Sequence, residues 1–598
     1  MKSIKITPLR EPAKAKITIP GSKSYTNRAL LLAALTSGTV RIKNPLVSDD
    51  THAMIACLRE LGISCSFKGD SLEVSGNLQR IADRAYNLNA NLSGTTIRFI
   101  LALACIVPGE KTIRGRGRLN ERPIAHLIDG LRQLGASIEY VEKEGFPPVR
   151  VLSSKLNPGN IKMKGDVSSQ FLSALLMVAP LIGEVTIEVD GEQVSRPYIE
   201  MTIDAMRAFG VTASHKNFAR YTVPASQTYK ADSYKIEGDV SSASYFFAIS
   251  TLTKSTFTLA NLNPHSVQAD MRFLKILERM GSKVEYGEDE ITITGGGTEA
   301  LTVDMQDCPD QAQTLAVLAA FAPGITTIKG IQSLRIKETE RVAAVERELG
   351  KMGINTESTP DTLVINGGNP KPASIDTYGD HRLAMAFAVA GTALPGMQIN
   401  DPDVVSKTYP NFWNALESVG VGLEFAYDNP NIVLIGMRGG GKTTVGRLLA
   451  GTLKREFVEL DELVEKQAGM SIPEIVEKHG WEYFRDMESE IVQKVSSKHG
   501  AVISTGGGVI IRPENMAALK ENGYLIFLST PVEILASRIE HDLNRPSLTG
   551  ASSPEKEIAT VLAERKKLYE AVADVVLKAG NLTPTEKADI ILQKLKEK

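Results

Sequence analysis

The sequence predicts an α/β protein made of two unlike parts, and three observations lead to this prediction. A unit of about 70 residues that mixes strands and helices repeats six times before residue 420. A glycine-rich loop then follows a short apolar strand near residue 436, and alternating strands and helices continue from there. The chain has 598 residues, too many for a single hydrophobic core, so we expect about three or four compact units.

Each repeated unit begins with a polar turn that leads into an Ala- and Leu-rich segment. The residues that open the six turns lie 69 to 75 residues apart and are Ser22, Ser93, Ser168, Ser241, Asp310 and Asp380. Ser and Asp cap helix N-termini, and helices that are apolar on nearly all sides are buried. If the units pack in like orientation, several helix N-termini converge and form an anion site. The alternative is a structural repeat whose turns only cap helices.

The repeat ends near Val419, and a new strand begins with the sequence NIVLIG at Asn431. We therefore place a boundary near Asp428. Between the repeated helices, runs such as TVRIKN and VTIEVD alternate apolar and polar residues as strands do.

Composition and charge exclude several classes of protein. The net charge of −2 gives no global field that favours nucleic acid or a membrane, and 42% hydrophobic with 23% charged residues is typical of a globular enzyme. The four cysteines form no C-x-x-C pair, which indicates reduced, mostly buried thiols. The N-terminal segment lacks the apolar run of a signal peptide, and no stretch is long enough to span a membrane. We expect a cytoplasmic protein with small-molecule substrates; the sequence indicates no oligomeric state.

The glycine-rich loop at residues 436–443 fits the pattern G-x-x-x-x-G-K-[ST] between a strand and a helix. Glycines let backbone N–H groups wrap phosphates, the lysine reaches the β- and γ-phosphates, and the following hydroxyl holds Mg²⁺. The residues expected to bind ATP are Gly436, Gly439, Gly441, Lys442, Thr443 and Thr444.

An ordered set of motifs after this loop resembles the shikimate kinase family over residues 430–598. These motifs are FVELD ending at Asp461, Phe484-Arg485 with Glu488, Gly506–Gly508, Arg545-Pro546 and RKKLY from Arg565. The resemblance implies that Asp461 holds the acceptor hydroxyl and acts as its base, that Arg485 and Arg565 grip the carboxylate, and that Gly506, Gly507 and Gly508 line the ring. It also implies that Arg545 binds ATP from a lid at about 541–554.

The resemblance further implies that Thr443 and Glu459 serve the Mg²⁺ of the kinase. Glu459 departs from the family, which usually has Asp at this position. Without the other motifs, we would interpret Arg485 and Arg565 as residues of a solvated helix face, because both lie in charge-rich segments.

Cations stand at or near the helix-starting turns of the repeated part, which argues for a substrate with several negative charges. Among them are Lys23, Arg98 and Arg382, and two carboxylates, Asp310 and Glu338, occur in the same set of motifs. A carboxylate among cations stays ionised, so its presence suggests proton transfer.

Seven motifs in order resemble the family of 5-enolpyruvylshikimate-3-phosphate synthases over about residues 1–425. They are PGSKS, SGTTIR, NERP, VSSQFL, SRPY, RIKETER and YGDHR. The resemblance implies an enolpyruvyl transferase fold of two domains, each an inside-out α/β barrel half built from three βαβαββ-type units. We assign 21–236 to the upper domain, 1–20 with 237–425 to the lower domain, 426–430 to a linker, and 431–598 to a nucleoside-monophosphate-kinase-like domain with a parallel sheet.

The resemblance also implies the roles of individual residues in the transferase. Shikimate 3-phosphate would be bound by Lys23, Ser24, Arg28, Ser168, Ser169, Gln170, Ser195, Tyr198, Asp310 and Lys337. Phosphoenolpyruvate would be bound by Lys23, Gly94, Arg98, Arg122, Gln170, Arg341, Arg382 and Lys407. Asp310 would take the proton of the 5-hydroxyl, and Glu338 with Lys23 would protonate the methylene carbon. No cofactor or metal is expected there. Gly94 leaves room beside phosphoenolpyruvate, which predicts inhibition by glyphosate.

These resemblances imply a bifunctional enzyme of the aromatic amino-acid (shikimate) pathway, a shikimate kinase joined to 3-phosphoshikimate 1-carboxyvinyltransferase. The alternatives are a transferase that acts on UDP-N-acetylglucosamine, a gluconate or nucleoside-monophosphate kinase, or a non-catalytic half. The first generally relies on a cysteine in its phosphoenolpyruvate loop, and the matching stretch 110–122 has none.

Overall fold

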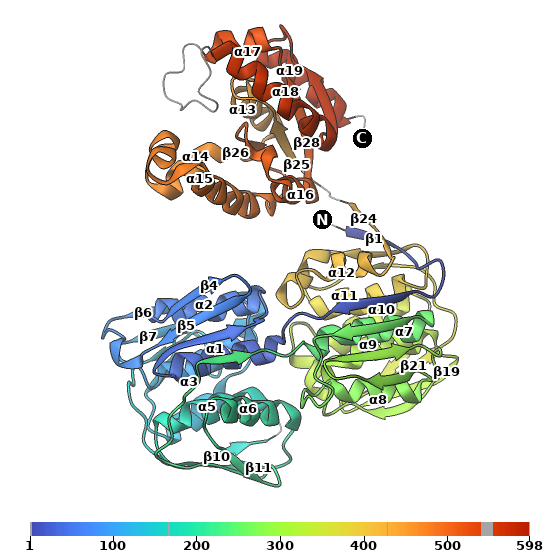
Figure 1. Cartoon of the computed structure of the whole chain (residues 1–598). Helices are drawn as coiled ribbons and strands as arrows, with labels where there is room; N and C mark the ends of the chain where they lie inside the picture. The colour runs from blue at the N-terminus through green and yellow to red at the C-terminus, as the bar shows by residue number, and fades with distance from the viewer. Residues whose placement is uncertain (1–2, 166–167, 427–428, 540–553, 597–598) are drawn as a thin grey trace. The chain divides into compact units, whose positions relative to one another are not determined.

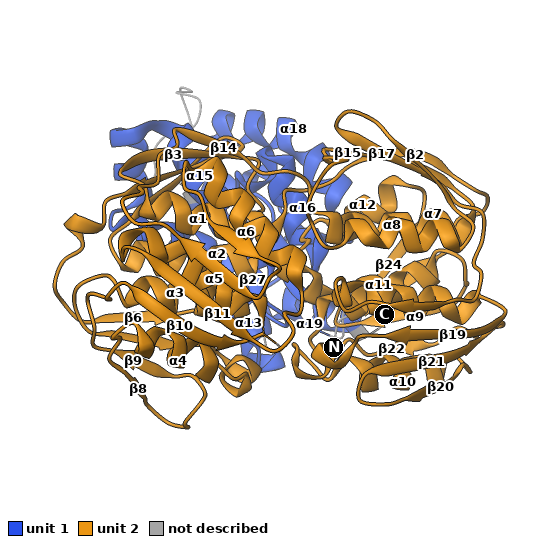
Figure 2. Ribbon diagram, turned by 90° about the horizontal axis from the view of Figure 1, so that it is seen from below, with its two compact units in different colours: residues 1, 427–598 blue, residues 2–426 orange. Residues whose placement is uncertain are grey.

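The computed structural model describes residues 3–165, 168–426, 429–539 and 554–596. The chain divides into two compact units, one of Lys2–Ala426 and one of Tyr427–Lys598 with Met1, which Figure 2 colours separately. This division falls within the predicted linker 426–430. The predicted lid and Arg545 lie outside the described residues.

The described part of Lys2–Ala426 contains six four-stranded sheets that share one plan. Each sheet opens with a parallel pair, and the third and fourth strands add antiparallel. In sheet order, the first three are β14 (Ser233–Lys235), β3 (Gly38–Lys43), β5 (Ser71–Gly76) and β4 (Ser64–Lys68); β6 (Tyr86–Asn89), β7 (Lys111–Arg114), β9 (Val149–Val151) and β8 (Ile138–Tyr140); and β10 (Gly159–Lys164), β11 (Val185–Asp190), β13 (Arg220–Val223) and β12 (Ser214–Lys216). The others are β2 (Lys14–Thr18), β15 (Thr256–Ala260), β17 (Glu290–Thr294) and β16 (Lys283–Tyr286); β18 (Thr302–Asp304), β19 (Gly324–Lys329), β21 (Thr362–Gly367) and β20 (Asn355–Ser358); and β22 (Ser374–Ile375), β23 (Met397–Asn400), β1 (Ser3–Thr7) and β24 (Gly422–Ala426).

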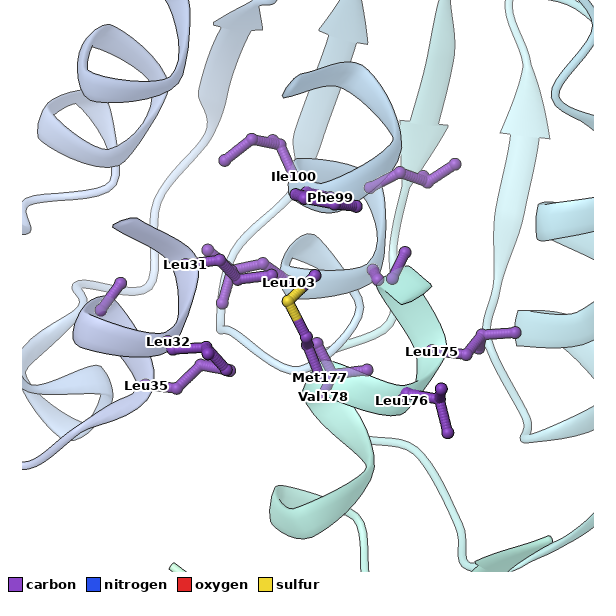
Figure 3. Close-up of a cluster of buried hydrophobic side chains, with 14 of the residues drawn as sticks. Leu31, Leu32, Leu35, Phe99, Ile100, Leu103, Leu175, Leu176, Met177 and Val178 are labelled. Atoms are coloured by element: carbon purple, nitrogen blue, oxygen red, sulfur yellow. The ribbon is translucent and has the colours of Figure 1, made fainter. Parts of the chain in front are cut away.

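Each sheet goes with one inner helix that is buried on nearly all sides and one amphipathic outer helix, as the repeat predicts. The inner helices are α1 (Lys23–Leu35), α3 (Gly94–Ala104), α5 (Ser169–Val178), α7 (Val240–Thr253), α9 (Ala312–Phe321) and α11 (His381–Gly391). The outer helices are α2 (Asp49–Glu60), α4 (Ala125–Gln133), α6 (Arg196–Ala208), α8 (Met271–Arg279), α10 (Arg341–Lys351) and α12 (Phe412–Ser418). Leu31 of α1, Leu103 of α3 and Met177 of α5 lie in one apolar cluster where these three inner helices meet (Figure 3).

Four of the six turn residues cap their helices as predicted. The side chains of Ser22, Ser93, Ser168 and Asp380 accept a hydrogen bond from a backbone N–H of the first helical turn. The prediction is wrong for the other two. Asp239 is the residue that precedes α7, so Ser241 lies inside the helix, and Asp310 lies in the 3₁₀ turn Pro309–Gln311 before α9.

Strand exchange divides this unit into two halves. Strand β14, from the end of the first 236 residues, completes the sheet of β3, whereas β1 and β2 pair with strands of the last three repeats. We call residues 21–236 the first half and residues 3–20 with 237–426 the second half (Figure 1). Each half has its own apolar core. The chain crosses between the halves at Gly21 and Gly238, which pair with each other. A Cβ at either glycine would lie 2.1 Å from a carbonyl oxygen, so no larger residue fits.

The second unit is a parallel five-stranded sheet between helices, as predicted for a nucleotide-binding domain. Its strands in sheet order are β26 (Phe457–Glu459), β27 (Val502–Ser504), β25 (Asn431–Ile435), β28 (Gly523–Ser529) and β29 (Val575–Lys578). Its helices are α13 (Lys442–Leu453), α14 (Leu460–Ala468), α15 (Ile472–Ser496), α16 (Pro513–Glu521), α17 (Val532–Ile539), α18 (Pro554–Val572) and α19 (Pro584–Lys596). Successive residues of β25 enter different apolar cores, so the sheet is covered on both faces.

All four cysteines are buried and unpaired, as expected from their spacing. Across the described ranges, none of the helices combines the length and the apolar character that crossing a membrane requires.

Candidate functional site

The first unit contains a pocket whose wall comes from both halves. A recess shares several lining residues with this pocket. Most of the residues expected to bind the transferase substrates line the pocket or the recess. They are Lys23, Ser24, Gly94, Arg98, Arg122, Ser168, Ser169, Gln170, Ser195 and Tyr198 from the first half, and Asp310, Lys337, Arg341 and Arg382 from the second. Glu338 lines the recess as well. Residues separated by more than 300 positions in the sequence therefore share one site.

The first-half wall is built from the N-terminal turns of inner helices. Lys23 opens α1, Gly94 opens α3 and Ser169 opens α5, so these helix N-termini are directed at the same pocket. Arg98 donates a short hydrogen bond to Gln170, whose amide in turn donates to Thr95 over 3.3 Å. The predicted convergence of polar helix starts is found here, and it supplies backbone N–H groups next to fixed cations.

Asp310 and Glu338 are each held by several cations of the second half. The carboxylate of Asp310 lies 3.0 Å from Arg341, 3.1 Å from Arg382 and 3.6 Å from Lys337. Burial opposes ionisation of Asp310, but Arg382 and Lys337 outweigh it and hold its pKa below the usual value.

Glu338 has an equivalent set of partners that reaches across to the first half. Its carboxylate lies 2.7 Å from Arg341, 3.2 Å from Lys407 and 3.9 Å from Arg122. Burial again opposes ionisation, but Lys407 and Arg341 keep the pKa of Glu338 well below its usual value. Both carboxylates are therefore ionised at neutral pH when no substrate balances the cations.

Two predicted binding residues do not line the pocket. Lys407 stands behind Glu338 and reaches the site through it. Arg28 is 2% exposed and donates to Thr202 and to the carbonyl oxygens of Ser24 and Tyr198 over 2.8 to 2.9 Å. The structure thus places Arg28 beneath the wall, where it holds the main chain of two lining residues.

The pocket of the second unit gathers the residues expected to bind shikimate. Asp461, Arg485, Gly506, Gly507, Gly508 and Arg565 line it together. Asp461 and Gly506–Gly508 follow the carboxyl ends of the neighbouring strands β26 and β27, which is where ligands bind in parallel sheets. Arg565 donates to the carbonyl oxygen of Gly507 over 2.9 Å, and a Cβ at Gly508 would lie 1.9 Å from the Arg485 guanidinium. Gly508 therefore leaves space that Arg485 needs.

The glycine-rich loop takes the conformation that its sequence predicts. Gly436, Gly439 and Gly441 all have positive φ angles, between 75° and 140°, which favour glycine. Lys442 opens α13 and its Nζ donates to two loop carbonyl oxygens over 2.8 Å, while Thr443 and Thr444 are exposed. This is the arrangement that wraps phosphates.

Glu459 fits a magnesium site next to the loop. One of its carboxylate oxygens is buried and accepts no hydrogen bond from any residue that the structure describes. Burial raises the pKa of Glu459 although the hydroxyls of Thr443 and Ser504 lie close to it. A buried carboxylate oxygen without a hydrogen-bond donor in the described part of the chain, close to the hydroxyl of Thr443, is a set of oxygen ligands that would suit Mg²⁺ and its water shell.

Several residues at the two sites were not assigned a role from the sequence. Asp50 pairs with Lys23 over 3.3 Å in the recess, Glu488 pairs with Arg485 over 2.6 Å, and Arg538 donates to the carbonyl oxygen of Gly439. His381, also in the recess, is 1% exposed, and neither ring nitrogen has a hydrogen-bond partner among the described residues. Of these residues, only Glu488 could have been found from the sequence, because it lies three positions after Arg485 on one helix face.

These two pockets define a chain that combines a transferase acting on multiply charged small molecules with a phosphate-loop kinase. The EPSP synthase (3-phosphoshikimate 1-carboxyvinyltransferase) family model matches residues 9–416, and the shikimate kinase model matches residues 438–596. The chain therefore belongs to the EPSP synthase family and carries a shikimate kinase domain at its C-terminal side. It is a bifunctional enzyme of the shikimate pathway, and its kinase domain uses ATP. The alternatives, a transferase that acts on UDP-N-acetylglucosamine, another small-molecule kinase or a non-catalytic half, are not favoured.

Relatives and solved structures agree with this placement. A 3-phosphoshikimate 1-carboxyvinyltransferase of a Sulfurovum strain is 40% identical over 425 residues, which is 70% of this chain and 99% of that protein. One from Vibrio atlanticus is 38% identical over 427 residues, 70% of this chain and all of that protein. The structure of EPSP synthase from Acinetobacter baumannii covers 71% of this chain and all of its own with a TM-score of 0.60; at 23% identity it shows the fold alone.

Proposed function

We propose that the pocket of the first unit binds shikimate 3-phosphate and phosphoenolpyruvate together through the residues that line it. Ser168, Ser169, Gln170, Ser195, Tyr198 and Lys337, with Ser24 and Lys23, take shikimate 3-phosphate. Gly94, Arg98, Arg122, Arg341 and Arg382 take phosphoenolpyruvate, supported by Lys407. The position of Arg28 supports a bracing role, and direct contact of Arg28 with the substrate stays a prediction.

The transfer would begin with Asp310 accepting the proton of the 5-hydroxyl as that oxygen attacks carbon 2 of phosphoenolpyruvate. Glu338, with Lys23, delivers a proton to the methylene carbon. Loss of phosphate from the tetrahedral adduct, together with removal of one proton from its new methyl group, then gives the enolpyruvyl ether. The substrates bring negative charge to the cations that now depress the pKa of Glu338, so binding raises that pKa and lets Glu338 carry the proton it must donate.

The kinase reaction would place shikimate between Asp461, Arg485 and Arg565. Asp461 accepts the proton of the 3-hydroxyl as the oxygen attacks the γ-phosphate, and ADP leaves. Lys442 stabilises the transferred charge, and we assign the same role to Arg545 of the predicted lid. Thr443 and Glu459 would hold Mg²⁺, which neutralises phosphate charge when bound. A cytoplasmic location stays a prediction.

One observation carries this proposal: two carboxylates from separate segments meet cations of both halves in a single pocket, while Lys442 and Asp461 belong to a different unit. The test is to assay Glu338→Gln and Lys442→Ala in the full chain with shikimate, ATP and phosphoenolpyruvate. Glu338→Gln should accumulate shikimate 3-phosphate without enolpyruvyl product. Lys442→Ala should make neither from shikimate, yet convert added shikimate 3-phosphate normally. Loss of both activities in either variant would contradict the assignment of the two reactions to separate sites.

A further inference from the structure

The fourth repeat turn is the one polar turn of the six to which the sequence assigns no function, yet it reaches the transferase pocket. Asp239, Ser241 and Ser242, at the start of α7, line that pocket together with Asp310 and Lys337. Tyr245, one turn further along α7, lines it as well. The turn therefore lines the pocket from the second half, and the Ser168 turn lines the same pocket from the first half.

Both serine hydroxyls of this turn donate to carboxylates. Ser241 Oγ donates a short hydrogen bond to Oδ2 of Asp270, and Ser242 Oγ donates to Oδ2 of Asp239 over 2.7 Å. Asp270 and Asp239 are 3% and 5% exposed, so solvent does not compete for these bonds. Burial raises the pKa of Asp270 to about 6, so at neutral pH it is ionised and can only accept.

A hydroxyl that donates its hydrogen bond to a carboxylate can only accept hydrogen bonds from other partners, through its lone pairs. Ser241 is partly exposed to the pocket, whereas Ser242 is almost fully buried. Ser241 Oγ therefore offers an acceptor to the pocket. The Ser168 turn has the opposite polarity, because Ser168 Oγ accepts from the backbone N–H of Gln170 and keeps its own proton to donate. One wall suits an anion, and the other suits a neutral donor.

Shikimate 3-phosphate has one neutral donor that the reaction does not use. Its carboxylate and phosphate are acceptors, and its 5-hydroxyl gives its proton to Asp310 in the proposed reaction. The 4-hydroxyl remains. We propose that Ser241 Oγ accepts a hydrogen bond from the 4-hydroxyl of shikimate 3-phosphate, with Asp270 as the positioning residue that turns the serine proton away from the substrate. This assignment makes the fourth turn a specificity element, since a phosphate at carbon 4 would meet lone pairs. It rests on the proposed placement of shikimate 3-phosphate.

The test is a cycle between protein and substrate. We would compare the wild-type chain and Ser241→Ala with shikimate 3-phosphate and with its 4-deoxy analogue. Ser241→Ala should raise KM for shikimate 3-phosphate by about tenfold and leave KM for the 4-deoxy analogue unchanged. The analogue has no 4-hydroxyl to donate to Ser241, so removing the serine hydroxyl costs it no hydrogen bond. Asp270→Asn should have the same substrate dependence, since its amide donates to Ser241 Oγ and turns the serine proton into the pocket.

Ser244→Ala is the matched control. Ser244 lies one turn further along α7, is fully buried, and donates to the carbonyl oxygen of Ser241 over 2.6 Å. Its loss can act only through the helix, so any effect should be equal for both substrates. An equal KM increase for both substrates in Ser241→Ala, or no increase for either, would overturn the inference. Asp310→Asn and Lys337→Met, assayed alongside, separate the two failures: if these variants turn over shikimate 3-phosphate normally, the proposed placement itself is wrong.

Discussion

The two candidate sites of this chain offer anions different kinds of partner. In the transferase pocket the cations are side chains, and several are already paired with carboxylates: Arg341 alone contacts Asp310, Glu338 and Asp380. In the second unit the proposed phosphate site is mainly a loop of backbone N–H groups with Lys442 at its end. A site made of paired side chains depends on a buried charge network, whereas a site made of backbone depends on glycine conformation and on space.

The largest effect should come from breaking the buried network at its centre. Arg341 is 2% exposed and Asp380 is fully buried, so Arg341→Met leaves an uncompensated charge in the core. We expect a loss of about 3 to 5 kcal/mol in the free energy of unfolding of the first unit. Urea unfolding of the full chain would measure it. Transferase activity should be lost while kinase activity persists.

Arg335→Met is the control for this variant. Arg335 pairs with Glu340 over 2.8 Å in the neighbouring turn, but both side chains are about a third exposed. Its removal should therefore cost about 1 kcal/mol or less. An equal loss for the two arginines would mean that the network of Arg341 has no special energetic role.

The backbone-dependent pocket should instead be sensitive to added volume. In Gly508→Ala the new methyl group would lie 1.9 to 2.4 Å from the guanidinium carbon and nitrogens of Arg485. Arg485 must therefore leave its place. Displacing a substrate-gripping group by about 1 Å costs about 10²-fold in rate. We expect a drop of that size in kinase kcat/KM for shikimate, with KM for ATP and transferase activity unchanged. An unchanged kinase kcat/KM for shikimate would contradict the placement of Arg485 in the binding site.

The same substitution in the transferase pocket should be milder. In Gly94→Ala the methyl group would lie 2.7 Å from the end of the Arg122 side chain, which can move. We expect KM for phosphoenolpyruvate to rise about tenfold, as for one weakened charged hydrogen bond. Glyphosate should inhibit the wild-type transferase in competition with phosphoenolpyruvate and inhibit Gly94→Ala less. Normal wild-type turnover at millimolar glyphosate would contradict this prediction.

The sequence could predict what depends on local pattern. Repeat spacing predicted six units with buried inner helices, and the glycine-rich loop needed only its own residues and the flanking strand and helix. It could not predict which side chains turn away from a pocket. Arg28 follows Lys23 and Ser24 by one helical turn, yet its partners Thr202 and Tyr198 lie about 170 positions away, and only tertiary packing reveals them.

The fourth turn shows the same limit for a side chain that lines a pocket although the sequence assigns it no role there. The sequence predicts that Ser241 caps a helix, because capping is the common use of serine before an apolar run. Asp239 precedes the helix instead, and Asp270 from a later segment binds the Ser241 hydroxyl. The repeat spacing predicts the position of this turn, but it does not predict the direction in which its serine hydroxyls donate.

The smallest effect concerns pH, and its sign should differ between the two units. The pKa values of Asp310 and Glu338 are depressed, so these groups stabilise the first unit above their usual pKa range near 4 and lose that contribution only in stronger acid. Burial raises the pKa values of Glu459 and Glu488, so their contribution to the second unit is largest in acid and falls as pH rises through the raised values. Lowering pH from about 7.5 to 5.5 should therefore protect kinase activity during a heat pulse more than transferase activity, with both assayed afterwards at one pH. Equal shifts for the two activities would mean that these four carboxyl groups do not set the acid response of their units.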